Sequence, residues 1–219
     1  MLAEWFGYRH KPLTQEQLFC DVKYHYTLHQ YIAKMIDLKK LADQPVLEIG
    51  SGHGTFAVQL RKLGFHKYIG IDDNTNNINF LTNTIGPYFK KQTLRGCSQT
   101  QSEAFSAVFS FNKLQSFENP LEAIDQIHQL LPKGGKFVGT TPYPFNRNVI
   151  SDASHLHVLH PRNWKRLFHL KKFRKVNTYP VSLIPYFWRV NPSLNPIIPA
   201  YIPGFNLTSM TLIIAEKGH

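Results

Sequence analysis

Residues 46–56 read Val46-Leu47-Glu48-Ile49-Gly50-Ser51-Gly52-His53-Gly54-Thr55-Phe56. An apolar run containing an acid is followed by three glycines at alternate positions, which predicts a buried strand that breaks into a tight turn. Glycine is needed where the backbone takes a positive φ or comes closer to a ligand than a Cβ allows. A helix predicted over 55–63 would direct its free N–H groups toward an anionic group. The stretch therefore predicts a ligand-binding turn between a strand and a helix.

A second strand is predicted over 68–71, and it ends in the polar residues Asp72, Asp73 and Asn74. In doubly wound sheets an acid at this place accepts hydrogen bonds from ribose hydroxyls. We expect Asp72 in that role, with Asp73 as the weaker candidate; capping of the next helix is an equal alternative for Asp73 and Asn74. The glycine spacing differs from the Gly-x-Gly-x-x-Gly of dinucleotide sites, which disfavours a pyrophosphate.

Three later stretches extend this pattern in order. They are the apolar run and turn 107–114, Asn119-Pro120 followed by apolar residues at helical spacing, and the glycine turn and apolar run 131–142. From residue 44 to residue 144 the chain resembles a class I S-adenosylmethionine-dependent methyltransferase of the small-molecule kind, similar to the methyltransferase type 11/23 domain group. The resemblance implies a Rossmann-like α/β fold: a doubly wound, mostly parallel, seven-stranded sheet with an antiparallel C-terminal hairpin.

The resemblance also implies S-adenosylmethionine as the cofactor and a site for it. The turn 50–54 would contact the methionine part and the ribose, Glu48 would orient the turn or the cofactor's amino group, and the backbone past the fourth strand would approach the methionine end. The candidate cofactor-binding residues are Glu48, Gly50, Ser51, Gly52, Gly54, Asp72, Asp73, Cys97, Ser98, Ser110, Phe111 and Asn112.

Three positions depart from the pattern of many relatives. Gly96-Cys97-Ser98 stands where they carry Gly-Asp after the third strand, so adenine recognition would rest on backbone groups. Phe105-Ser106 replaces a common Phe-Asp, and Gln115-Ser116 replaces a frequent Glu-His. The departures leave the fold intact but weaken the case for catalysis, and a non-catalytic methyltransferase-like binding protein is the alternative function.

Charge and composition bear on what the protein binds and in which compartment it works. The 219 residues carry a formal net charge of +11, and basic residues concentrate in 162–175, where they alternate with Trp164, Phe168 and other apolar residues. This pattern predicts an amphipathic basic helix that runs into a strand, with the apolar side of the helix covering the sheet. Contact of its basic side with an anionic membrane surface or RNA is the alternative. With two cysteines, no signal peptide and no long apolar run, we expect a cytoplasmic protein, peripheral to a membrane if that contact exists.

We expect one domain over 1–219, made of a helical cap (1–43), a cofactor-binding core (44–144) and an acceptor side (145–219). The cap helix is predicted from Thr14 to about Ala42, and its Tyr24, His25, Tyr26 and His29 either close over the active site or pack against the sheet. Strands near 175–183 and 209–216 would form the hairpin. The loop 184–207 between them is rich in proline and aromatic residues and predicts a lid or a contact surface.

Methyl transfer to an acceptor that holds a proton requires a base, and the run 155–161 after the fifth strand supplies candidates. Histidine suits the task because its ordinary pKa lies near neutrality, so His155 and His157 are the catalytic candidates; a structural role is the alternative. No metal site is expected, because the spacing of the histidines does not bring three rings to one point.

The sequence thus predicts methylation of an O or C atom of a small, apolar or aromatic acceptor. The oligomeric state stays open. An RNA methyltransferase is a further alternative, although the chain lacks the Asn-Pro-Pro-Tyr type of motif that is typical of base N-methylation.

Overall fold

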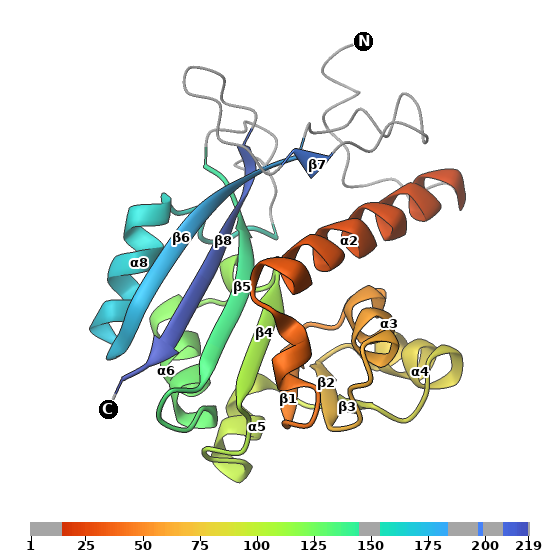
Figure 1. The fold of residues 1–219 in the computed structure, drawn as a ribbon, viewed down its shortest axis with the longest axis horizontal. Coiled ribbons are helices and arrows are strands. Elements are labelled where there is room, and N and C mark those ends of the chain that lie inside the picture. The colour runs from red at the N-terminus through yellow and green to blue at the C-terminus, as the bar shows by residue number, and fades with distance from the viewer. Residues whose placement is uncertain (1–14, 145–153, 184–196, 199–207, 219) are drawn as a thin grey trace.

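The computed structural model describes residues 15–144, 154–183, 197–198 and 208–218 (Figure 1). The central sheet has the strand order β3-β2-β1-β4-β5-β8-β6-β7. Its strands are β1 Val46–Ile49, β2 Tyr68–Asp72, β3 Phe89–Lys91, β4 Ala107–Phe111, β5 Lys136–Pro142, β6 Phe173–Leu183, β7 Ile197–Ile198 and β8 Thr208–Lys217. The first five are mutually parallel, and β8 inserts antiparallel between β5 and β6.

Helices cover both faces of the sheet (Figure 1). They are α2 Gln15–Met35, α3 Thr55–Lys62, α4 Thr75–Thr84, α5 Leu94–Thr100, α6 Pro120–Leu130 and α8 Pro161–Leu170, with the short 3₁₀ helices η1 Leu38–Leu41 and η2 Leu114–Ser116. Side chains of α2, α3 and α4 form one core cluster with residues such as Val46, and those of α5, α6 and α8 form a second with its neighbour Leu47. Burial on both faces explains why the central parallel strands β1 and β4 are mostly apolar.

The predicted fold class is confirmed, including the antiparallel hairpin of β6 and β8. The two-residue strand β7 adds an eighth, edge position beside β6, within the proline-rich stretch 184–207 that otherwise lies outside the described residues. An edge place suits this stretch because proline cannot donate to an inner ladder.

Two predicted helices end earlier in the structure. The cap helix was predicted to reach Ala42, but α2 ends at Met35, and Asp37 takes a left-handed conformation (φ 51°) before η1 begins. The basic helix runs into a strand as predicted, but the change comes inside 162–175: α8 ends at Leu170, Lys172 is left-handed (φ 63°), and β6 begins at Phe173. In α8, Trp164 and Phe168 are buried against the sheet while Arg162, Lys165 and Arg166 are exposed, as its amphipathic pattern predicts.

Among the described residues, no helix combines the length and apolar character that crossing a bilayer would need.

Candidate functional site

The glycine turn links β1 to α3 and is built from left-handed backbone. Gly50, Gly52 and Gly54 have φ of 76°, 47° and 73°, a region that side chains other than glycine rarely adopt. Gly54 also lies against α4 and the residue after it, because a Cβ added there would stand 2.3 Å from Ile85 Cδ1 and 2.7 Å from Leu81 Cδ2. Conformation therefore favours glycine at all three positions, and packing adds to this preference at Gly54.

Replacing Gly54 with alanine should destabilise the protein by about 3 kcal/mol, since left-handed strain costs roughly 1 to 2 kcal/mol and overpacking roughly 1 to 3 kcal/mol. Gly52→Ala is the matched control: it has the same backbone strain, but nothing lies within 4 Å of its added Cβ. Urea unfolding of both variants measures the difference. Equal losses in the two would mean that packing on Leu81 and Ile85 does not constrain the turn.

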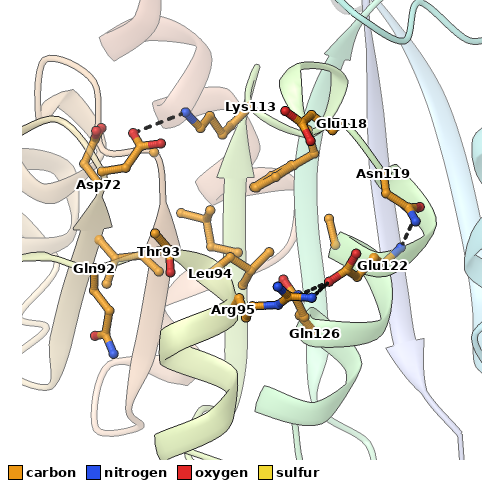
Figure 2. Close-up of a pocket in the computed structure, with 16 residues that line it drawn as sticks. Asp72, Gln92, Thr93, Leu94, Arg95, Lys113, Glu118, Asn119, Glu122 and Gln126 are labelled. Carbon is orange, nitrogen blue, oxygen red and sulfur yellow. Dashed lines mark hydrogen bonds and ion pairs between the residues drawn. The ribbon is translucent and has the colours of Figure 1, made fainter.

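Two cavities lie at the carboxyl ends of the parallel strands, on either side of this turn. The first has a volume of about 340 Å³ and is lined by the ends of β1 and β2, the start of α5, and the segment from Lys113 into α6 (Figure 2). The second has a volume of about 290 Å³ and lies between the glycine turn, the end of β4 and α2. Both cavities are lined by Gly50, Asp72 and Lys113.

Asp72 is the buried acid of the first cavity, with 8% of its surface exposed. It ends β2, and its Oδ1 accepts a hydrogen bond of 2.9 Å from the backbone N of Asn74, which leaves the carboxylate with capacity for a ligand. Asn74 caps α4, since its Oδ1 accepts from the backbone N of Asn76 and of Asn77. Of the two predicted alternatives for Asn74, the structure shows the cap.

Asp73 lines the first cavity and pairs with Lys113.

Histidine and phenylalanine rings line the second cavity and its wall. His29 of α2 is buried, its Nδ1 lies 3.2 Å from Thr55 Oγ1, and its ring centroid is 4.3 Å from that of Phe111 and 5.2 Å from that of Phe56. Burial, and to a smaller degree the nearby His25, hold the pKa of His29 well below its ordinary value, so this ring is neutral at pH 7. His25 lines the same cavity, with its ring centroid 6.2 Å from that of His29.

Glu48 lies in the floor of the second cavity and is 2% exposed. The hydroxyl of Tyr68 donates a short hydrogen bond to its Oε2. Burial raises the pKa of Glu48 to about 8, and the charge of Asp72 adds to the rise, while the bond from Tyr68 opposes it. The carboxyl group therefore holds its proton near neutral pH.

The structure brings most of the predicted cofactor residues together. Seven line the second cavity, namely Glu48, Gly50, Ser51, Gly52, Asp72, Phe111 and Asn112, and Asp73 joins Gly50 and Asp72 in the first. Gly54 caps α3 behind the turn, and Ser110 is buried inside β4. Neither lines a cavity.

Cys97 and Ser98 lie in α5 and line neither cavity. Cys97 belongs to the core cluster beneath the sheet, and Ser98 Oγ donates to the carbonyl of Arg95 in its own helix. The residues that reach the first cavity come earlier, directly after β3: Gln92, Thr93, Leu94 and Arg95. Thr93 turns the chain into α5 by accepting a bond from the backbone N of Gly96, so a Thr-x-x-Gly cap was the available signal.

The two predicted catalytic histidines also line neither cavity. His157 is bound to the segment between β4 and α6, part of which lines the first cavity: its backbone N donates to the carbonyl of Gln115 at 2.9 Å, and its Nε2 lies 3.0 Å from the carbonyl O of Glu118. His155 lies two residues earlier in the same irregular segment. His25 and His29, predicted either to close over the site or to pack on the sheet, line the second cavity, as does His53 of the glycine turn.

An open sheet with a glycine turn after β1, an acid after β2 and cavities at the strand ends defines the class I methyltransferase architecture. Residues 20–178 match the methyltransferase domain family. The chain therefore belongs to this family, as an S-adenosylmethionine-dependent methyltransferase. Comparison with curated proteins gave no match.

Solved structures share the fold at low sequence identity. An S-adenosylmethionine-dependent methyltransferase from Archaeoglobus fulgidus has a TM-score of 0.68 and 17% identity, covering 88% of this chain and 94% of its own. A possible histamine N-methyltransferase from Thermotoga maritima has a TM-score of 0.68 and 17% identity, covering 90% of each chain. A putative methyltransferase solved with the Trm112 activator of Haloferax volcanii has a TM-score of 0.67 and 14% identity, covering 95% of this chain and 100% of its own.

The residues of the two cavities fit S-adenosylmethionine. A buried carboxylate at the end of β2 suits the ribose diol, the glycine turn lets the backbone approach the ligand, and Leu94 and Phe117 offer apolar surface beside them in the first cavity. The cofactor supplies a methyl group activated on a sulfonium centre. What the chain must add is orientation and, for a protonated acceptor, a base.

Asp72→Ala should weaken the binding of S-adenosylhomocysteine by about 2 to 3 kcal/mol, near a hundredfold, because a charged acceptor for the ribose hydroxyls is lost. Asp72→Asn keeps an oxygen for the backbone N of Asn74 and separates binding from folding. Asp43→Ala, an exposed acid before β1 at the opposite end of the strand, is the control. If calorimetry finds that Asp72→Ala binds S-adenosylhomocysteine as tightly as wild type does, Asp72 is not a ligand of the cofactor.

Proposed function

We propose that this enzyme transfers the methyl group to an O or C atom of a small aromatic acceptor seated in the second cavity. The observation that carries the proposal is the makeup of that cavity. It has room for a small molecule, adjoins the glycine turn, and carries the ring of Phe111 together with the imidazoles of His25 and His29. Rings pack favourably on rings in tilted or edge-on geometries, so this wall suits an aromatic acceptor.

His25 is the proposed general base. It lines the cavity from α2, whereas His155 and His157 do not. His29 suits a positioning role better, since it is buried and neutral, and its Nδ1 is engaged with Thr55 Oγ1. His25 would take the proton of an acceptor hydroxyl, or of an acidic carbon, as that atom attacks the methyl group.

The test is an acceptor screen that measures S-adenosylhomocysteine release from S-adenosylmethionine. The panel contains phenols, catechols, 1,3-dicarbonyl compounds, aliphatic acids and total transfer RNA. Turnover with a phenol or a 1,3-dicarbonyl compound supports the proposal. Turnover with transfer RNA alone would overturn it in favour of RNA methylation, and tight cofactor binding without any turnover would favour the non-catalytic alternative.

A further inference from the structure

The side chain of Lys113 lies over Gly50, a residue that both cavities of the cofactor site share. Lys113 follows the end of β4, and its ammonium Nζ is 3.7 Å from Asp73 Oδ1 after the end of β2. Since β1 stands between β4 and β2, the side chain passes over the end of β1. A Cβ added at Gly50, directly after β1, would stand 3.0 to 3.2 Å from the Cβ, Cγ and Cδ of Lys113.

The two cavities share the side chain of Lys113 as part of their walls. Lys113 lines both, together with Gly50 and Asp72. Figure 2 shows the lysine pointing from its strand toward the acids at the end of β2. A cofactor that extends from the second cavity into the first passes Gly50, which lines both cavities and which the aliphatic part of Lys113 covers.

The backbone beneath the lysine is fixed. The backbone N of Asn112 donates to the carbonyl of Thr140 at 2.9 Å, and the carbonyl of Lys113 accepts from the backbone N of Ser116 at 3.0 Å and from Ser116 Oγ at 2.7 Å. The ion pair between Lys113 and Asp73 is weak. Of the Lys113 side chain 33% is exposed, and of the Asp73 side chain 63%, and exposed ion pairs contribute little to stability. The side chain can therefore swing while the strand end stays in place.

We propose that Lys113 is a latch of the cofactor site: its side chain lies over Gly50 and pairs with Asp73, and a cofactor that spans the two cavities must displace it. The proposal rests on the cofactor site and is independent of the acceptor. Part of the cofactor's binding free energy is then used to open the latch, so removal of the lysine makes binding tighter. A lysine that served as a ligand would have the opposite effect.

The test is calorimetric titration of wild type, Lys113→Ala and Lys175→Ala with S-adenosylhomocysteine. Lys113→Ala should bind about three- to fivefold more tightly, the range that corresponds to one exposed ion pair. Lys175→Ala, which breaks the ion pair of 2.9 Å with Glu216 on the far strands, should bind as wild type does. Salt weakens exposed ion pairs, so raising NaCl from 0.05 to 0.5 M should favour binding more in wild type than in Lys113→Ala.

Several outcomes would overturn the latch. They are unchanged or weaker binding by Lys113→Ala, tightening by Lys175→Ala to the same degree, or parallel salt dependence in wild type and Lys113→Ala. A wrong assignment of the cofactor site would give a different result, because neither wild type nor Lys113→Ala would then bind S-adenosylhomocysteine. Binding by Lys113→Ala alone would be the strongest support.

Discussion

Turnover of the His25→Ala enzyme should be about a hundred- to ten-thousand-fold lower than that of wild type, the range that a general base contributes. The expectation follows from the wall of the second cavity, where His25 is placed by α2 beside the glycine turn. The loss should appear in kcat with an acceptor from the screen, while the Kd for S-adenosylhomocysteine changes little. Single-turnover kinetics at saturating cofactor measure it directly.

His157→Ala is the matched histidine control. His157 connects its segment to the carbonyl groups of Gln115 and Glu118. Its loss should lower stability by about 1 kcal/mol, the net contribution of one hydrogen bond, and leave kcat within severalfold of wild type. A large loss of kcat in His157→Ala with none in His25→Ala would restore the histidines after β5 as the catalytic candidates.

The core of the fold was predictable because each of its signals is local. The glycines after β1 mark backbone that only glycine adopts readily, and the apolar runs of β1, β2 and β4 indicate strands buried on both faces. These constraints act within a few residues, so a single sequence records them. The order of such units then restricts the sheet to few topologies.

The far wall of the cofactor site was harder to predict because β3 has only three residues, two of them exposed lysines. Without a visible strand end, the loop that follows it was placed too late, at Cys97 and Ser98 instead of Gln92 to Arg95. The pairing of Lys113 with Asp73 joins residues forty positions apart through the neighbouring strands β2, β1 and β4. No local pattern in the sequence encodes it.

The histidines near the glycine turn show the same limit of sequence-based prediction. The motif spacing placed a base after β5, yet two of the histidines that line the second cavity belong to α2, whose packing against α3 brings His25 and His29 to the glycine turn. A helix alternates its faces every few residues, so the sequence alone left two roles open for this segment.

The stability of the Glu48→Gln variant should rise relative to wild type as pH increases from about 4.5 to 8. In the folded wild type, burial keeps the pKa of Glu48 near 8, whereas the unfolded chain ionises this group near pH 4.5. Between these values the folded state holds one proton more than the unfolded state, so wild-type stability falls by up to about 1.4 kcal/mol per pH unit on account of this group. Glutamine does not titrate, and its amide oxygen still accepts the hydroxyl of Tyr68.

Urea unfolding of both proteins at pH 5 and pH 8 measures this effect. The unfolding free energy of Glu48→Gln minus that of wild type should be about 4 kcal/mol more favourable at pH 8, because the wild type alone must keep a buried acid protonated or ionise it away from water. Glu118→Gln, which removes an exposed carboxylate at the rim of the first cavity, should show nearly the same difference at both pH values. A Glu48→Gln difference that does not vary with pH would mean that Glu48 is already ionised in the folded protein, and that the bond from Tyr68 outweighs burial.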